Sequence, residues 1–422
     1  MTYSAKNKDR TLGTDEDTEI RRIIKNEVER QKSQIILIAS ENFASQEVIR
    51  TMGSVLTNKY AEGYPGARYY AGCENVDEAE QLAIDRANKL FGSDYCNVQP
   101  HSGVCANFAI FLGVLNCGDR ILGMNLRAGG HLSHGHKLNL TGKYYETHSY
   151  TVDSETEMLD YENIKQVART VRPKLIIAGA SSYSRIIDFK KFREIADEVG
   201  AYFMADIAHI AGLVVSGYHP SPVKVADFTT ATTHKTLRGP RGGLVIADKK
   251  YGNLIDKSVF PGVQGGPLMH IIAAKAVAFH EALKDSFKDY NRRIIENSKA
   301  LCEYMKNEGF RIVFGGTDNH LSLLDLTSKK ITGAEAVETL TFVGIIVNKN
   351  VIPFDKLPPT IASGIRIGTP AVTTQGMGVK EMHKIGELIS SALKNRSNKT
   401  KLNSIREEVK NLAGEFPIYT GL

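Results

Sequence analysis

Short apolar runs that alternate with helical stretches constrain the fold of this chain of 422 residues more than any other feature. Helical patterns occupy 77–91, 106–115 and 189–199, and short apolar runs lie among and after them at 120–124, 174–178, 202–206, 226–230 and 243–247. Strands that alternate with helices form a mostly parallel, doubly wound sheet with helices on both faces. We therefore expect an α/β fold.

The second half of the chain changes character, which predicts a further domain. The chain is longer than a single hydrophobic core usually supports. A long helical stretch covers 269–307, and after it strands at 311–314 and 321–326 mix with helices at 333–342 and 379–394, as in a small α+β domain. We expect an N-terminal arm over 1–60 with a helix at 14–34, a large domain over 61–285 and a small C-terminal domain over 286–422.

Composition argues against several classes of protein. Lys and Arg outnumber Asp and Glu by 53 to 47, a weak bias that favours anionic small molecules and does not indicate nucleic acid. The most basic stretch, 394–401, is interpreted as solvated, with RNA binding as the alternative. No apolar run approaches the roughly 18 residues of a membrane span. The stretch 1–19 is polar and lacks the apolar region of a secretory signal. Five cysteines without a CxxC pair lead us to expect a reducing cytoplasm.

Asp206 ends one of the expected strands, and Lys235 follows another. Together they could bind a cofactor that needs both an amine and a carboxylate. Lys235 lies among hydroxyl residues; a lysine kept from bulk water can attack a carbonyl, whereas a solvated surface lysine is the commoner alternative. Asp206 stands at a strand end, where ligands of α/β sheets gather, although an Asp there can also simply cap a helix. Together they match pyridoxal phosphate, whose aldehyde takes a lysine and whose ring nitrogen takes a carboxylate. His209 is then a candidate contact of the ring oxygen.

Three further motifs are weaker when taken alone. In PHSGVCAN (100–107), Ser102, Gly103 and the start of the next helix offer donors to a phosphate, but Ser-Gly before a helix is also common turn chemistry. Three histidines in HLSHGH (131–136) suggest a metal, yet no cysteine or well-spaced carboxylate joins them, so we expect none and consider a stacked imidazole or loop filler instead. Arg366 can bind a substrate carboxylate or lie on the surface.

Taken together, these segments resemble the serine hydroxymethyltransferase family of fold-type I pyridoxal-phosphate enzymes over almost the whole chain. The motifs that carry the resemblance are LIASEN (37–42), NKYAEGYPGARYYAGC (58–73), GGHLSHG (129–135), SSYS (181–184), ADIAHIAGL (205–213), THKTLRGPRGG (233–243), QGGPLMH (264–270) and SGIRIGTPA (363–371). The resemblance implies a mostly parallel sheet of the seven-stranded type and pyridoxal 5'-phosphate held in the large domain. It also implies tetrahydrofolate as co-substrate and a homodimer with active sites shared between subunits.

The resemblance further implies a role for individual residues. Lys235 would form the internal aldimine with His234 beside it, and Asp206 would hold the ring nitrogen. The other cofactor contacts would be His209 at the ring oxygen, His131 stacked on the ring, Ser181 nearby, Ser102, Gly103 and Val104 at the phosphate, and Gly265 or Gly266 from a neighbouring subunit. The amino-acid substrate would meet Ser40, Tyr70 and Arg366, with Glu62 as general acid/base and Tyr60 reaching across a dimer interface. The positions that match folate contacts are Tyr69, Leu126, Gly130, Leu132 and Asn350.

The implied reaction is the reversible transfer of the hydroxymethyl carbon of L-serine to tetrahydrofolate, giving glycine and 5,10-methylenetetrahydrofolate through an aldimine and a quinonoid. A related β-hydroxy-amino-acid aldolase or transaldolase with a non-folate acceptor would share every cofactor residue and is the alternative. The chain departs from the family pattern at Val104, Cys105, Ala231 and Val263. Val104 and Cys105 remove one hydroxyl from the phosphate loop, which predicts cofactor binding weaker by roughly 1.5–3 kcal/mol.

Overall fold

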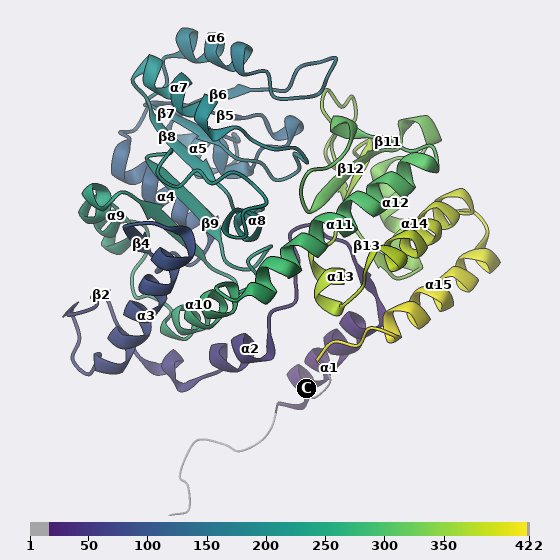
Figure 1. Ribbon diagram of the computed structural model, residues 1–422, viewed down its shortest axis with the longest axis horizontal. Coiled ribbons are helices and arrows are strands. Elements are labelled where there is room, and N and C mark those ends of the chain that lie inside the picture. The colour runs from purple at the N-terminus through teal and green to yellow at the C-terminus, as the bar shows by residue number, and fades with distance from the viewer. Residues whose placement is uncertain (1–16, 420–422) are drawn as a thin grey trace, which may run out of the picture.

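The computed structural model describes residues 17–419, and a seven-stranded sheet forms the centre of its larger lobe (Figure 1). The strand order is β4-β10-β9-β8-β7-β5-β6. The strands are β4 (Tyr95–Asn97), β5 (Arg120–Met124), β6 (Glu146–Tyr150), β7 (Leu175–Ala178), β8 (Tyr202–Asp206), β9 (Phe228–Thr232) and β10 (Gly243–Ala247). The strands from β9 to β6 are parallel, and β10 runs antiparallel to both of its neighbours. The expected mostly parallel α/β sheet is confirmed.

Both faces of this sheet are buried, which explains its continuous apolar runs. The helices around it are α3 (Glu74–Phe91), α4 (Gly103–Val114), α5 (Leu140–Tyr144), α6 (Tyr161–Val171), α7 (Phe189–Val199), α8 (Ala211–Val215), α9 (Gly252–Lys257) and α10 (Met269–Ala282). Side chains of a strand point alternately to opposite faces. In β7, Leu175 and Ile177 belong to one core with α4, whereas Ile176 and Ala178 belong to a second core with α6 and α7.

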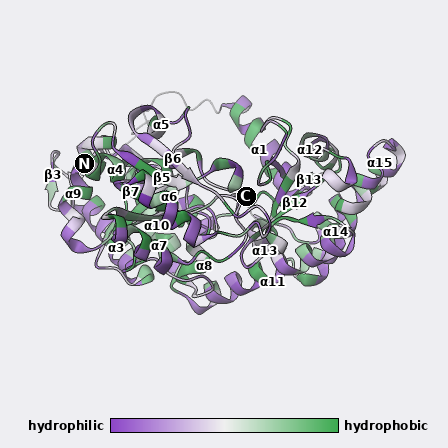
Figure 2. Cartoon of the chain, turned by 90° about the horizontal axis from the view of Figure 1, so that it is seen from above, coloured by the Kyte–Doolittle hydropathy of each residue, from purple (hydrophilic) through white to green (hydrophobic). Residues whose placement is uncertain are grey.

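A smaller antiparallel sheet forms a second lobe, on the other side of the molecule in Figure 2. Its strands lie in the order β11 (Arg311–Ile312), β12 (Leu321–Asp325), β15 (Gly364–Gly368) and β14 (Asn348–Asn350). The helices of this lobe are α11 (Asp285–Asn307), α12 (Gly333–Phe342), α13 (Pro370–Gln375), α14 (Val379–Lys394) and α15 (Lys399–Gly414). Most of these elements share a separate hydrophobic core, in which Leu324, Ile365 and Ile385 are fully buried.

The N-terminal segment connects the two lobes. Helix α1 (Thr18–Ser33) contacts α15, and β1 (Ile35–Ile36) pairs in parallel with β13 (Ile345–Ile346), so Ile35 lies in the core of the small lobe. Helix α2 (Gln46–Met52) then packs on α10 of the large lobe. Residues between these contacts, including Ser40, are thereby held at the junction of the lobes. The hairpin of β2 (Gly63–Tyr64) and β3 (Ala67–Arg68) follows.

Several predicted boundaries are wrong for identifiable reasons. The stretch 269–307 is two helices rather than one, because Lys284 has an extended backbone between α10 and α11. The strand predicted at 226–230 is β9, two residues later, because buried threonines continue it beyond the apolar run. The strand predicted at 311–314 is paired only as far as Ile312. Helix α1 begins after its N-cap Asp17, and the predicted residues 14–16 lie outside the described part.

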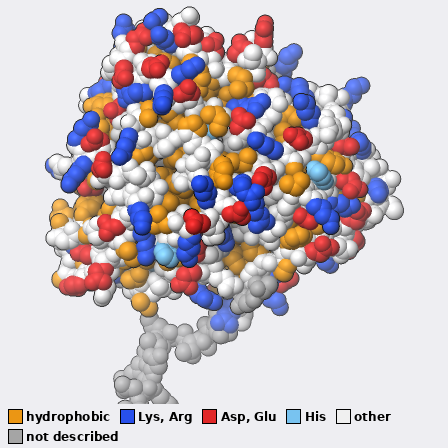
Figure 3. All heavy atoms as spheres, in the orientation of Figure 1, with side chains coloured by type: hydrophobic (Ala, Val, Ile, Leu, Met, Phe, Trp, Pro, Cys, Tyr) orange, Lys and Arg blue, Asp and Glu red, His pale blue; other side chains and the backbone are white. Residues whose placement is uncertain are grey.

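The surface carries mixed charge and a few exposed apolar side chains. Figure 3 shows Lys, Arg, Asp and Glu side chains interspersed over one face. Helix α1 buries none of its side chains, and Ile20, Ile23 and Ile24 are about half exposed on it, with exposed fractions of 47%, 51% and 57%. Within residues 17–419, none of the helices combines the length and the apolar character needed to cross a bilayer. The five cysteines are all free.

Candidate active site

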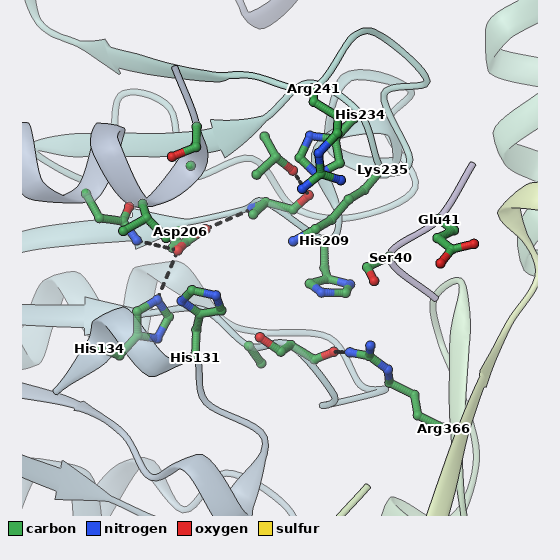
Figure 4. Close-up of a pocket in the computed structure, with 18 residues that line it drawn as sticks. Ser40, Glu41, His131, His134, Asp206, His209, His234, Lys235, Arg241 and Arg366 are labelled. Atoms are coloured by element: carbon green, nitrogen blue, oxygen red, sulfur yellow. Dashed lines mark hydrogen bonds and ion pairs between the residues drawn. The ribbon is translucent and has the colours of Figure 1, made fainter. Parts of the chain in front are cut away.

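A cavity of about 430 Å³ lies at the carboxyl ends of β8 and β9 and faces Arg366 on β15 (Figure 4). This is the end of a parallel sheet at which ligands of α/β proteins gather. The predicted site residues that line the cavity are Ser40, Ser102, Gly103, Val104, His131, Ser181, Asp206, His209, His234, Lys235 and Arg366. The fold therefore brings together residues spread over more than 300 positions of the sequence, from Ser40 to Arg366.

Lys235 lies in the turn that follows β9, and its side chain extends into the cavity (Figure 4). Its backbone is fixed, because its carbonyl accepts hydrogen bonds from Asn42 Nδ2 at 2.8 Å and from the amide of Arg238 at 3.0 Å. Burial lowers the pKa of Lys235 to about 8, the charge of Asp206 opposes this, and the charge of Arg366 adds to it. Within the described residues, Nζ makes no hydrogen bond, so the amine is available to a ligand.

Asp206 ends β8 and is held as a carboxylate. Its Oδ2 accepts hydrogen bonds from Asn107 Nδ2 and from His134 Nε2, each at 2.9 Å, and Oδ1 accepts from the amide of Ala208 at 3.0 Å. Burial raises the pKa of Asp206, but the hydrogen bonds from His134 and Asn107 favour the carboxylate, and the pKa lies well below its ordinary value. The carboxylate therefore stays ionised at neutral pH. The alternative that Asp206 caps the next helix is wrong, because α8 begins after Ile210.

Two neutral imidazoles lie beside this pair. Nδ1 of His131 accepts from the amide of Ser133 at 3.1 Å, and burial lowers the pKa of His131 to about 4. Nδ1 of His209 lies 3.2 Å from Nε2 of His320, with the two rings stacked at 28°. Burial also lowers the pKa of His209 well below its ordinary value. Both rings are therefore uncharged at neutral pH and present flat or polar surfaces to the cavity.

Arg366 is a buried cation without a carboxylate partner in the described part of the chain. Its side chain donates to the carbonyl of Ser181 and, at 3.2 Å, to Oδ1 of Asn348. Burial lowers the pKa of Arg366 to about 10, which still leaves it charged at neutral pH. A guanidinium that meets only neutral acceptors in a cavity is a ready site for a ligand carboxylate.

The start of α4 lies against the same cavity. Ser102 is the N-cap, and its Oγ accepts from the amide of Cys105 at 3.2 Å. A Cβ atom on Gly103 would lie 2.6 Å from Cγ2 of Thr232, so a glycine is needed for the loop to pass this strand. Val104 lines the cavity at the place where the family pattern has a hydroxyl. The amides of this helix end can bind an anion.

A second group of predicted residues lies together outside the cavity. Glu62 accepts hydrogen bonds from the hydroxyls of Tyr60 at 3.3 Å and Tyr70 at 3.4 Å. A Cβ on Gly265 would lie 3.2 Å from Glu62 Oε1, and one on Gly266 would lie 3.2 Å from Cζ of Tyr60. Tyr60 is 56% exposed. These residues form one surface cluster, and the fold does not bring them to the cavity of their own chain.

The predicted folate positions do not line the cavity either. Leu126 and Gly130 flank a turn whose Gly129 carbonyl accepts from the amide of Ser181 at 2.7 Å. Asn350 Nδ2 lies 3.4 Å from Oγ of Ser182, so it borders the same turn. The side chain of Leu132 is 48% exposed.

Tyr69 lies apart from this group and is 75% exposed. Its ring makes an edge contact with Phe260. The structure therefore divides the predicted folate residues between two places.

The decisive comparison is with protein-family models. The model described as "Serine hydroxymethyltransferase" matches residues 14–389 of this chain. The chain belongs to the serine hydroxymethyltransferase family. Its members are pyridoxal-phosphate-dependent enzymes of fold type I that use tetrahydrofolate as co-substrate, so the expected fold class, enzyme class and cofactor are confirmed.

The cavity of this family member fits pyridoxal phosphate. The free amine of Lys235, the ionised carboxylate of Asp206 and the helix end at Ser102 supply one partner each for an aldehyde, a ring nitrogen and a phosphate. The buried Nδ1 of His234 also makes no hydrogen bond within the described residues, so it is available to a bound cofactor. Within residues 17–419, no group of three His, Cys, Asp or Glu side chains is arranged to hold a metal ion.

The sequence interpretation missed several residues of this site. His134 was considered only as a metal ligand or loop filler, yet it contacts Asp206 directly. Asn107, Thr232 and Arg241 also line the cavity. Asn107 lies one turn inside α4, so the spacing of four residues from Gly103 could have indicated it. Arg241 carries no comparable sequence signal, because its position follows from the turn after Lys235.

Proposed function

We propose that this enzyme reversibly transfers the hydroxymethyl carbon of L-serine to tetrahydrofolate, giving glycine and 5,10-methylenetetrahydrofolate. The observation that carries the proposal is the combination, in one cavity, of the unbonded amine of Lys235, the ionised Asp206 and the unpaired cation of Arg366. The cofactor needs the amine and the carboxylate, and an amino-acid substrate needs the cation of Arg366 as a partner for its own carboxylate.

The cofactor-holding residues follow from this arrangement. Lys235 would hold the cofactor through its amine, and Asp206 would keep a proton on the ring nitrogen, because its pKa stays well below that of the ring. His131, His209, His234 and Ser181 would border the ring, while Ser102, Gly103 and Val104 would lie at the phosphate. Bound pyridoxal phosphate supplies an electron sink that stabilises negative charge on the substrate Cα.

The cofactor supplies the electron sink, whereas residues of the chain would orient the substrate. Arg366 would bind the carboxylate of serine, with Ser40 beside it at the junction of the lobes. Fixing the carboxylate sets the direction of the other bonds at Cα relative to the ring, which is where an oriented site contributes most to the rate.

Proton transfer at the serine hydroxyl is assigned to Glu62. This residue and Tyr60, Tyr70, Gly265 and Gly266 form the exposed cluster described above. We propose a homodimer in which this cluster completes the cavity of a second copy, with Glu62 moving a proton at the hydroxyl oxygen. The observation that supports this is that the cluster lies outside the cavity of its own chain. A carboxylate held by two phenols is suited to such a proton transfer.

The folate acceptor would lie near Tyr69, Leu126, Gly130, Leu132 and Asn350.

The proposed reaction is tested by supplying the purified enzyme with serine labelled at its hydroxymethyl carbon, with and without tetrahydrofolate. The proposal expects glycine and labelled methylenetetrahydrofolate in equal amounts, and little glycine without folate. Serine or threonine cleavage that is indifferent to folate would assign the enzyme to the aldolase alternative.

A further inference from the structure

The chain between β4 and Ser102 is held by side chains from outside the large sheet. Directly after β4, the carbonyl oxygens of three successive residues accept hydrogen bonds from side chains. Gln264 Nε2 donates to Gln99 O at 2.8 Å. Lys275 Nζ donates to Val98 O at 2.6 Å and to Pro100 O at 3.0 Å. These side chains therefore fix the backbone that leads to Ser102.

Lys275 also connects this segment to β10. Its Nζ donates a third hydrogen bond, of 2.8 Å, to the carbonyl of Gly243, the first residue of β10. The amide of Gly243 donates to Pro100 O at 3.0 Å, and a Cβ on Gly243 would lie 2.3 Å from the carbonyl oxygen of Ser102. Lys275 thus binds two backbone segments that enclose Ser102, from a position on α10 that is 1% exposed.

Three carbonyl partners require a charged amine. An ammonium group has three N–H donors, whereas a neutral amine has two. Burial lowers the pKa of Lys275 to about 7, but three acceptors favour its charged form. No carboxylate of the described residues forms an ion pair with it, since the nearby Glu80 is bonded to Arg68 at 2.6 Å and to Gln99 at 2.7 Å. A positive charge without an anionic partner therefore lies behind the helix end at Ser102.

We propose that Lys275 is a positioning residue for the cofactor phosphate, acting through the backbone of Ser102 and Gly103 and through its buried charge. This inference rests on the proposed function, in which that loop holds the phosphate. Lys275 does not line the cavity, so it acts without touching the ligand. The charge also partly replaces what the loop lacks at Val104, where no hydroxyl is present.

The test compares two ligands that differ only in the phosphate. Full-length protein freed of cofactor is titrated with pyridoxal 5'-phosphate and with pyridoxal, and each Kd is read from the absorbance of the adduct with Lys235. In Lys275→Met, the Kd for pyridoxal phosphate should rise at least about tenfold, since a charged hydrogen-bonding group contributes this much. The Kd for pyridoxal should change less than about twofold. Lys288→Met, on the exposed side of α11, should alter neither value.

Lys275→Gln is the second variant, because a shorter neutral amide can keep one of the carbonyls bonded if the Met variant does not fold. Equal losses for both ligands would show that Lys275 is merely structural and would overturn the proposal. An unchanged ratio of the two Kd values in either folded variant would do the same. If the unaltered protein forms no adduct with pyridoxal phosphate at all, the proposed function fails instead.

Discussion

His134 donates a 2.9 Å hydrogen bond from Nε2 to Oδ2 of Asp206, the carboxylate assigned to the cofactor ring. Asn107 donates to the same oxygen at 2.9 Å. His134 and Asn107 therefore fix both the direction and the ionised state of the carboxylate that we assign to the ring. The functional consequence is that Asp206 can hold a proton on a pyridine nitrogen without taking it.

Replacing His134 with Ala should weaken cofactor binding. Asp206 would lose one of its two side-chain donors, and a hydrogen bond to a charged group contributes about 1.5–3 kcal/mol, or about 10- to 100-fold in Kd. The Kd of pyridoxal phosphate, measured by absorbance titration, checks this. His136→Ala in the same loop is the control, because His136 does not contact Asp206. Equal affinities for the two variants would contradict the assignment.

Cofactor attachment should respond to pH around the lowered pKa of Lys235. The neutral amine is the form that attacks an aldehyde. Since burial lowers its pKa to about 8, the neutral fraction grows as pH rises through about 8, whereas an ordinary lysine would need a pH above 10. The rate at which cofactor-free enzyme reacts with pyridoxal phosphate, followed by stopped flow from pH 6 to 10, should rise and level off near pH 9.

Asp206→Asn provides the matched control for this profile. The charge of Asp206 raises the pKa of Lys235, so its removal should move the midpoint to lower pH. A midpoint near 10 in the unaltered enzyme, or a shift to higher pH in the variant, would show that the electrostatics of the site have been misassigned.

Arg366→Gln should impair serine binding without unfolding the protein. Arg366 has no carboxylate partner among the described residues, so its removal relieves the cost of a buried charge while leaving two neutral acceptors unbonded. We expect the KM for serine to rise about 10- to 100-fold, as for the loss of a charged hydrogen bond, with a small change in Tm. Arg292→Gln on the exposed face of α11 should leave both values unchanged. An unaltered KM in the Arg366 variant would remove it from the substrate site.

The inner strands of the large sheet were predictable because burial on both faces makes them continuous apolar runs, whereas the edge strand β6, polar and mostly not buried, was missed. Leu175 to Ala178 and Tyr202 to Asp206 are examples, and the polar residue that ends the second run marks the site. The shift of β9 shows the limit: Thr230 and Thr232 are buried polar residues whose hydroxyls are satisfied by Asn107 and Ala208, and a sequence does not reveal such partners.

The sequence indicates a site residue when the cofactor chemistry requires one particular residue type. It does not indicate a residue that matters only through its contacts with other parts of the chain. Lys235 and Asp206 were identified because the cofactor demands an amine and a carboxylate. His134 and Lys275 were not, because they contact residues that are distant in the chain: Asp206 lies 72 positions from His134, and Val98 and Pro100 lie more than 170 positions from Lys275. Helix α15 was missed because it follows a polar, basic segment and was interpreted as part of that solvated stretch. Its apolar residues Leu402, Ile405 and Val409 are buried only against other elements of the small lobe.

Two inactive variants should restore activity when combined, if Glu62 serves a second copy of the chain. Glu62→Gln and Lys235→Ala each disable one component of the site, but they lie in different regions of the same chain. In a mixed dimer, one site takes Lys235 from the first variant and Glu62 from the second, so it is intact. Random mixing makes half the dimers mixed, and about a quarter of all sites should then be active.

The two variants are co-expressed with different affinity tags, and tandem purification isolates the mixed dimers for folate-dependent serine cleavage assays. The matched control combines Lys235→Ala with Asp206→Asn. Both of these residues line the same cavity of one chain, so no mixed dimer contains an intact site and no activity should return. No recovery in mixed dimers of the first pair would reject the shared site. Recovery in the control would show that Lys235 and Asp206 of one chain do not serve the same cavity, and the assay would then not locate Glu62.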